Sequence, residues 1–255
     1  MIPKIIHYCW LSDDPYPELI QKCIASWKAV LPDWELRLWD KECLKEIDDP
    51  WVHEAYEAKV YAHASDFIRL YAVYNYGGFY LDCDVEVIKD FAPLLRHRYV
   101  FSLENPENQV NGIFIEAATF GAEAGNELLK ECMTFYHGRH FINPDGSNNI
   151  KLTIPYVLGQ IFGDFQLIES EQQLDTSLPI LQVLPAEYFS PKSGLFHKMT
   201  DLTPNTYSIH HFQGAWIPMI EKLKSKTSNR VYSFFGNGIY SVICKVVTVL
   251  KKFFS

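Results

Sequence analysis

The chain has 255 residues, of which 48% are hydrophobic and 15% aromatic, and its formal net charge is −8. This length and composition allow a full hydrophobic core, in one large domain or two small ones, and exclude an intrinsically disordered protein. The excess of acidic residues argues against nucleic acid as the main partner, because a phosphate backbone attracts basic surfaces.

The N-terminal part of the chain predicts a β–α–β arrangement. Residues 3–10 (PKIIHYCW) form a short apolar segment, and residues 34–40 (WELRLWD) alternate between apolar and polar side chains, which is typical of strands. Between them, residues 17–31 have apolar side chains at helical spacing. A second helical pattern precedes Gly77 and Gly78, where we expect that helix to end.

The rest of the chain continues to alternate between strand and helix patterns. A strand over residues 79–82 follows the two glycines, so Asp82 and Asp84 fall at its C-terminal end. Further along, the patterns predict strands at 98–104, 111–117 and 206–212, helices at 125–137 and 154–162, and a loop at 141–149. Alternating elements with a ligand site at a strand's C-terminal end predict an α/β domain.

The two aspartates flank Cys83, and Glu86 follows two residues after Asp84. Side chains two apart point the same way in an extended segment, so we expect the three carboxylates to share one face. Close like charges need a compensating cation, and a hard divalent ion such as Mg²⁺ or Mn²⁺ also holds the oxygens of a diphosphate. A solvated acidic turn is the alternative interpretation.

The residues before this pair favour the cation hypothesis. Ser65, Asp66 and Arg69 precede the double glycine and the Asp-x-Asp pair at a spacing through which the chain resembles glycosyltransferase family 32. That family includes the yeast initiating α-1,6-mannosyltransferases and many bacterial capsular polysaccharide and lipopolysaccharide enzymes, with the clostridial glucosylating toxins as more distant relatives. The likeness also covers residues 2–10, 34–40 and 210–216.

The resemblance implies a GT-A type nucleotide-sugar-binding fold, an α/β fold with a mixed central sheet flanked by helices, and Mn²⁺ or Mg²⁺ as the cofactor. It makes Asp84 the direct metal ligand and assigns Asp82 to the ribose or, through water, to the metal. His211 takes the place of a third metal ligand, with His210 as the alternative, because neutral imidazole is an acceptable ligand for Mn²⁺.

Asp66 and Arg69 lie three residues apart on one predicted helix face. The resemblance implies that they grip the sugar hydroxyls, since a carboxylate accepts hydrogen bonds from hydroxyls and a guanidinium donates them. A surface ion pair between the two residues is the alternative. Together with Asp82 and Asp84 they are the predicted catalytic residues, and Ser65 is implied as a further substrate-binding residue.

Other substrate contacts are predicted for aromatic side chains and a histidine. Trp10 closes the first strand, where a family aromatic stacks on the nucleotide base, and a core tryptophan is an equal alternative. His7 and Tyr8 line the base pocket or pack beside it. Tyr80 shares the face of Asp82 and is predicted to contact the nucleotide.

Two further contacts and two departures from the family pattern lie later in the chain. Asn111 is predicted near the donor sugar, although Asn-Gly also suits a tight turn, and Trp216 is predicted to donate its indole N–H to the diphosphate. Many members carry Ser at the position of Ala215. A Thr-Gly-Pro triplet stands in many members where this chain has Thr153, Ile154 and Pro155, which leaves the acceptor contacts open.

The predicted function is the retaining, metal-dependent transfer of a hexose from a nucleotide sugar to a saccharide acceptor in polysaccharide biosynthesis. UDP-hexose is the preferred donor, with GDP-mannose second, and the acceptor is expected on a polyprenyl diphosphate carrier. One alternative is a metal-dependent nucleotidyltransferase or phosphoesterase, although the sequence has no Walker-type glycine-lysine motif. Another is a carbohydrate- or membrane-binding protein without catalysis.

The last part of the chain differs in charge from the rest. Residues 222–255 contain Lys and Arg but no Asp or Glu. We expect residues 1–221 to form the catalytic domain, and this basic tail to contain an amphipathic helix on an anionic membrane surface, with packing on the domain as the alternative. Scattered cysteines and an N-terminus without a signal-peptide pattern predict reduced thiols and a cytoplasmic location, at the inner face of the plasma membrane.

Overall fold

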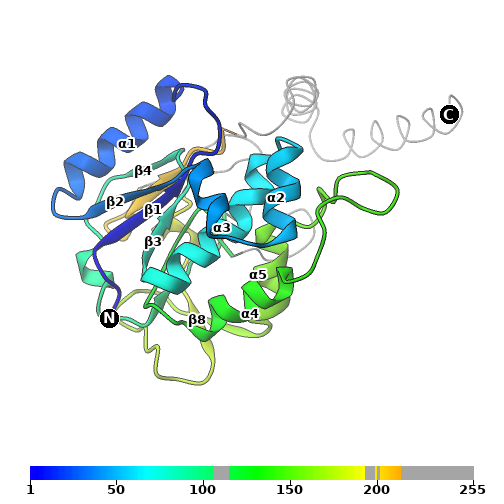
Figure 1. Cartoon of the computed structure of the whole chain (residues 1–255). Coiled ribbons are helices and arrows are strands. Elements are labelled where there is room, and N and C mark those ends of the chain that lie inside the picture. The colour runs from blue at the N-terminus through cyan, green and yellow to red at the C-terminus, as the bar shows by residue number, and fades with distance from the viewer. Residues whose placement is uncertain (106–114, 193–198, 200–201, 214–255) are drawn as a thin grey trace, which may run out of the picture. The chain divides into compact units, whose positions relative to one another are not determined.

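The computed structural model describes residues 1–105, 115–192, 199 and 202–213 (Figure 1). These residues belong to one compact unit, Met1–Gln213. Within the described ranges, no helix combines the length and the apolar content needed to cross a bilayer. The predicted tail at 222–255 and the domain boundary before it lie outside the described residues.

A five-stranded sheet forms the centre of this unit, in the order β2-β1-β3-β6-β5. Its strands are β1 (Ile5–Cys9), β2 (Glu35–Trp39), β3 (Gly78–Leu81), β5 (Tyr99–Val100) and β6 (Thr119–Ala122). β1 pairs in parallel with β2 and β3, whereas β6 pairs antiparallel with β3 and β5. The sheet is therefore mixed, and the predicted α/β class with a mixed central sheet is confirmed.

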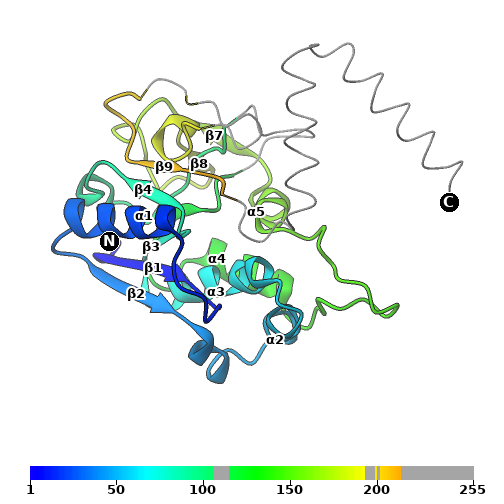
Figure 2. The same ribbon diagram turned by 90° about the horizontal axis from the view of Figure 1, so that it is seen from above.

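Helices cover both faces of the sheet (Figure 2). On one face lies α1 (Glu18–Val30), which contacts the short strand β4 (Val85–Val87) outside this sheet. On the other face α3 (Tyr61–Tyr76) packs against β1 and β3. α3 also contacts the remaining helices, α2 (Pro50–Glu57), α4 (Glu127–Tyr136) and α5 (Ile154–Phe162).

Short elements complete the described unit. β4 (Val85–Val87) pairs antiparallel with β9 (Ser208–His210), and β7 (Phe165–Leu167) pairs in parallel with β8 (Leu181–Val183). The described residues also form the short 3₁₀-helices η1 (Lys41–Lys45), η2 (Ala92–Leu94) and η4 (Ala186–Tyr188). The β4–β9 pair matters most for function, because it joins the segment after the two aspartates to the end of the described chain.

The first helix is amphipathic, and its buried residues Ile20, Cys23, Ile24 and Trp27 recur at helical spacing. The indole N–H of Trp27 donates to the carbonyl of Val85 at 2.7 Å. α1 therefore also fixes the strand that follows the Asp-x-Asp pair.

The double glycine allows the chain to turn directly from α3 into β3. Gly77 and Gly78 have φ angles of 64° and 106°, a region that residues with a side chain rarely adopt. A Cβ at Gly78 would lie 2.5 Å from the carbonyl oxygen of Ile5 on β1. Glycine is thus required where the backbone of β3 begins to pass along β1, and the helix end predicted at Gly77 is confirmed.

Several elements are absent from the sequence prediction, among them α2, β6, β7 and β8. α2 begins with a recognisable signal, because Asp49 accepts a hydrogen bond from the N–H of Trp51 at 3.0 Å and Pro50 occupies the first helical position. β6 is buried along its whole length and shows no polar alternation. The predicted strand at 98–104 is shorter, and most of the predicted strand at 111–117 lies outside the described residues.

The cysteines that the structure describes are free thiols at Cys9, Cys23, Cys43, Cys83 and Cys132.

Candidate active site

The segment Asp82–Asp84 is a tight turn between β3 and β4. The N–H of Val85 donates to the carbonyl of Asp82 at 3.0 Å. The Cys83 thiol donates to the carbonyl of Cys9 at 3.2 Å, which fixes the turn against the C-terminal end of β1. The aspartates therefore lie at the end of two neighbouring parallel strands, where α/β sheets commonly bind ligands.

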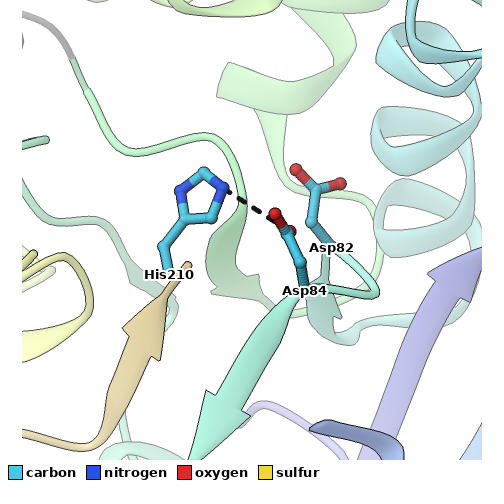
Figure 3. A group of neighbouring side chains, drawn as sticks. All are labelled: Asp82, Asp84 and His210. Carbon is cyan, nitrogen blue, oxygen red and sulfur yellow. Dashed lines mark ion pairs between the residues drawn. The ribbon is translucent and has the colours of Figure 1, made fainter. Parts of the chain in front are cut away.

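Donor atoms of Asp82, Asp84 and His210 all lie within 4.8 Å of one another (Figure 3). His210 ends β9, whose antiparallel pairing places it opposite Val85. Its Nε2 lies 3.6 Å from Oδ1 of Asp84. Two carboxylates and an imidazole in this arrangement fit a divalent ion such as Mn²⁺. The histidine that the sequence analysis names as the alternative ligand is thus the one that faces the aspartates.

His211, the ligand preferred from the sequence, has other partners. Its Nε2 lies 2.9 Å from Oε2 of Glu86, and Nζ of Lys192 donates to its carbonyl at 3.2 Å. Neighbouring side chains on extended backbone point to opposite faces, so only one of two adjacent histidines can face the turn. The expectation that Glu86 shares a face with the two aspartates is wrong, because the chain turns at Asp82–Asp84 instead of running straight.

Arg69 on α3 joins that helix to the turn. Its guanidinium donates to the carbonyl of Ala117 at 2.8 Å and to Oγ of Ser65 at 3.1 Å. It also lies 3.2 Å from Oδ1 of Asp66 and 3.4 Å from Oδ1 of Asp82, and its side chain is only 5% exposed. The alternative of a surface ion pair is therefore wrong, because the pair is buried.

Asp66 is also enclosed. Its side chain is 7% exposed, and its Oδ2 accepts a hydrogen bond from the N–H of Ile154, at the start of α5, at 3.1 Å. The donor is a backbone group, so Ile154 in place of the family's glycine retains it. Burial raises the pKa of Asp66 to about 7; Asp82 acts in the same direction, while Arg69 and the hydrogen bond from Ile154 oppose it.

The guanidinium of Arg69 stays charged in these surroundings. Burial alone lowers the pKa of Arg69, but the charge of Asp82, with Tyr80 and Asp66, outweighs burial and raises that pKa. The cation therefore holds both carboxylates in place in the described structure.

His7 is fully buried, so it does not line an open base pocket. Its Nδ1 accepts a hydrogen bond from the indole N–H of Trp39 at 3.0 Å, so its Nε2 donates to the carbonyl of Gly77 at 2.8 Å. Burial is the main cause that lowers the pKa of His7 to about 4. The ring is neutral, and both of its nitrogens already form hydrogen bonds within the protein. Neither nitrogen is left to contact a nucleotide.

Tyr80 supports Asp82. Its side chain is 1% exposed, its hydroxyl donates to Oδ1 of Asp82 at 2.9 Å, and its ring centroid lies 4.6 Å from the guanidinium carbon of Arg69. The predicted contact with the nucleotide does not fit this position, because the ring is covered by the protein.

Tyr8 and Trp10 are half-buried at the C-terminal end of β1. The ring of Tyr8 lies 5.2 Å from that of Trp27, and the ring of Trp10 lies 5.0 Å from that of Tyr16. Both predicted base contacts stay predictions. Asn111 and Trp216 lie outside the described residues, as does Ala215.

Sequence reasoning missed Glu116. This residue is 1% exposed, and its Oε1 accepts from the N–H of Ala118 at 2.7 Å and lies 3.3 Å from Nδ1 of His210. Burial lowers the pKa of His210, but the negative charges of Glu116 and Asp84 outweigh it and raise that pKa to about 9. A single acidic residue in an apolar segment has no sequence signal that would identify it.

Comparison with known proteins identifies the region that contains the turn. Residues 17–101 match the family described as "Glycosyltransferase sugar-binding region containing DXD motif". The chain carries a DXD-type glycosyltransferase region. Inositol phosphoceramide mannosyltransferase 3 of Schizosaccharomyces pombe is 35% identical over 103 residues, which are 38% of this chain and 28% of that protein. Mannosyl phosphorylinositol ceramide synthase SUR1 of Saccharomyces cerevisiae is 32% identical over 102 residues, 37% of this chain and 26% of that protein.

Solved structures with some likeness are also glycosyltransferases by title. The PaToxG glycosyltransferase has a TM-score of 0.45 at 18% identity, over 63% of this chain and 69% of that chain. A glycosyltransferase involved in the glycosylation of the major capsid of PBCV-1 has a TM-score of 0.41 at 11% identity, over 82% of this chain and 93% of that chain.

The DXD-type glycosyltransferase region contains Asp66, Arg69, Asp82 and Asp84, and the predicted resemblance to glycosyltransferase family 32 is confirmed. The match spans 28% and 26% of the two yeast proteins. His210 and Glu116 lie beyond residues 17–101, so later parts of this chain complete the site around the DXD turn.

Proposed function

We propose that this protein transfers a hexose from a nucleotide sugar to a saccharide acceptor in polysaccharide biosynthesis, in a metal-dependent reaction that retains the anomeric configuration. The observation that carries the proposal is the group of Asp82, Asp84 and His210, which is built on the turn of a DXD-type glycosyltransferase region. Retention is inferred from the resemblance to family 32.

The residues present fit a divalent cation, Mn²⁺ or Mg²⁺. Their carboxylate and imidazole donors lie within 4.8 Å of one another and are half-buried, so they can contact both an ion and a ligand from solvent. We expect Asp84 and His210 as ligands, with Asp82 bound directly or through water. A cation held there would stabilise the negative charge that develops on the leaving diphosphate.

The chain's own residues would orient the sugar. Ser65 and Ala117 hold Arg69 between Asp66 and Asp82 in the described structure, so these charges need no rearrangement during the reaction. Asp66 would accept hydrogen bonds from sugar hydroxyls. We infer a same-face transfer in which an oxygen of the leaving phosphate takes the proton of the acceptor hydroxyl.

The donor and acceptor are narrowed by the names of the relatives. Two of them are named as mannosyltransferases or mannosyl synthases that act on inositol phosphoceramides. Because of these names, we propose GDP-mannose as the first donor and UDP-hexose, which the sequence favoured, as the second. The same names support an acceptor carried by a lipid. A saccharide on a polyprenyl diphosphate carrier remains the acceptor that we propose.

Donor hydrolysis tests the proposal. The full chain is incubated with GDP-mannose, UDP-glucose or UDP-galactose, and the released nucleotide is measured. We expect slow release of GDP or UDP from one donor with Mn²⁺, loss of this release with EDTA, and its return on adding Mn²⁺. Release of a nucleoside monophosphate would support a nucleotidyltransferase or phosphoesterase instead. Binding of every donor without release would support a non-catalytic protein.

We propose in addition that residues 222–255 attach a catalytic domain, residues 1–221, to the inner face of the plasma membrane. The support is the charge of the segment, which has Lys and Arg but no Asp or Glu. Flotation with anionic phosphatidylglycerol vesicles should recover the full chain at low salt and the truncated chain poorly, while both hydrolyse donor. Equal recovery of the two would exclude the tail as the anchor, and unfolding of the truncated chain would favour packing on the domain.

A further inference from the structure

We propose that Glu116 is a positioning residue that orients the imidazole of His210, so that Nε2 of the ring faces Asp82 and Asp84. The proposal rests on the proposed function, because Glu116 would act on the cation only through His210. It adds a residue to the site that lies outside the DXD-type region.

The first support is the arrangement of the two ring nitrogens. Nδ1 of His210 lies 3.3 Å from Oε1 of Glu116, and Nε2 lies 3.6 Å from Oδ1 of Asp84. The distance from Nδ1 to Glu116 is an ion-pair distance, and Nδ1 makes no hydrogen bond in the described structure. A proton on Nδ1, the ring nitrogen next to Glu116, would leave the lone pair of Nε2 for an ion. Histidines that bind metals commonly donate their other ring N–H to a carboxylate in this way, which sets both the tautomer and the ring orientation.

The second support is that Glu116 is itself held by backbone tied to the DXD turn. Its Oε1 accepts from the N–H of Ala118 at 2.7 Å, and the carbonyl of Ala118 accepts from the N–H of Asp82 at 2.8 Å. The N–H of Glu116 donates to the carbonyl of Ser102 at 2.9 Å. The carboxylate therefore has a defined position relative to both the turn and the histidine.

The third support is the packing of the ring. The ring centroids of His210 and Phe212 lie 3.7 Å apart, with 28° between the ring planes. Phe212 has a φ of 51°, a left-handed conformation that is uncommon outside glycine and often marks functional sites. With Glu116 at one edge and Phe212 on one face, few orientations remain for His210.

The fourth support is the cost of burying this charge. Glu116 is 1% exposed, and its ion-pair partner among the described residues is His210; within the same residues, Oε2 has no hydrogen-bond partner. Burying an ion pair is costly, and apolar side chains would fill the same space at lower cost. Packing alone thus does not account for an acidic residue here.

A double-mutant cycle tests the role. The affinity for Mn²⁺ in the presence of GDP or UDP is measured from the electron paramagnetic resonance signal of free Mn²⁺, for Glu116→Ala, His210→Ala and the double variant. We expect Glu116→Ala to weaken binding by about 10- to 100-fold. In the His210→Ala background, the same change should alter the affinity by less than about twofold, because the two residues act as one unit.

The conservative variant and a matched control separate positioning from general stability. Glu116→Gln keeps an oxygen acceptor for Nδ1–H, so its Mn²⁺ affinity should fall between those of the wild type and Glu116→Ala. If Glu116→Ala does not fold, Glu116→Gln takes its place in the double-mutant cycle. Glu171 is another buried carboxylate, 5% exposed, and accepts from the hydroxyls of Tyr188 and Tyr207. Glu171→Gln should lower the melting temperature and leave the Mn²⁺ affinity unchanged.

The outcomes separate this proposal from the proposed function. A wild-type protein that binds no Mn²⁺ would overturn the metal dependence and the role of Glu116 together. A wild-type protein that binds Mn²⁺ while Glu116→Ala binds it equally well would overturn the role of Glu116 alone. If Glu116→Ala lowered the Mn²⁺ affinity equally in the wild type and in the His210→Ala variant, the role of Glu116 would also be overturned.

Discussion

Two sides of the candidate site are built in different ways. The motif side, residues 61–84, is one continuous stretch of α3, the double glycine, β3 and the DXD turn. The closing side, residues 115–118 and 208–213, comes from two distant segments. On the motif side Arg69 reaches Asp66 and Asp82 within that stretch. On the closing side His210 reaches Asp84 because β9 pairs with β4.

The difference shows where a sequence motif stops being informative. The motif side lies wholly within the segment that matches the glycosyltransferase family, and the closing side lies wholly beyond it. The charges on the motif side lie within one stretch of the chain, although Arg69 and Asp66 also bond to the backbone of Ala117 and Ile154. The closing side depends wholly on long-range pairing. Substitution of the buried Arg69 on the motif side should therefore affect folding as well as catalysis, whereas substitution of His210 on the closing side should affect mainly metal binding.

The largest effect should come from the DXD turn itself. We expect Asp84→Asn to lower Mn²⁺-dependent donor hydrolysis by at least about 100-fold, because a preorganised charge at the ion is lost. The melting temperature should change little, since the asparagine side chain can still accept the hydrogen bond that Asp84 accepts from the N–H of Gln213 at 2.8 Å. Hydrolysis at the wild-type rate would show that the turn does not hold the ion.

The second prediction removes the cation of the motif side. Arg69→Met leaves Asp66 and Asp82 without their buried partner, so the free energy of unfolding should fall by about 3–5 kcal/mol in urea titrations. Arg37→Met is the matched control, because Arg37 pairs with Glu35 at 2.8 Å and its side chain is 31% exposed. That change should lower the free energy by less than about 1 kcal/mol. Equal losses of free energy in the Arg69→Met and Arg37→Met variants would mean that the ion pairs of Arg69 do not stabilise the fold.

The third prediction addresses the closing side through two adjacent histidines. His210→Ala should weaken Mn²⁺ binding by at least about tenfold, whereas His211→Ala should leave it unchanged, because Nε2 of His211 lies 2.9 Å from Glu86 instead. Calorimetric titration of Mn²⁺ with a nucleoside diphosphate measures both. The reverse order of effects would restore His211 as the ligand and remove the basis for a role of Glu116.

The fourth prediction concerns the pH dependence of stability. The pKa of Asp66 is raised from 3.8 to about 7, so between these values the folded protein binds a proton that the unfolded chain has released. The contribution of Asp66 to the free energy of unfolding is fully present below pH 3.8 and is lost as pH rises through about 7. The stability of the wild type relative to Asp66→Asn should thus fall over this window, by at most about 1.4 kcal/mol per pH unit. A constant difference in urea titrations would show that Asp66 stays ionised.

The sequence predicted more of the fold than of the contacts. β1, α1, β2, α3 and β3 follow from periodicity and from the two glycines. α2 was missed although Asp49 and Pro50 mark its start, and β6 was missed because a fully buried strand lacks alternation. The assumption of a straight segment through Asp82–Asp84 placed Glu86 on the wrong face, since one turn changes the direction of every side chain after it.

The sequence by itself determined the α/β class, the position of the DXD pair at a strand end, and the resemblance that assigns a sugar-nucleotide chemistry. These depend on residues close together in the chain, whose spacing and propensity act locally. Only the tertiary structure decided that His7 and Tyr80 are buried supports, that His210 rather than His211 faces the aspartates, and that Glu116 stands behind it. Those outcomes depend on burial and on the register between β4 and β9, which brings together residues more than a hundred positions apart in the sequence.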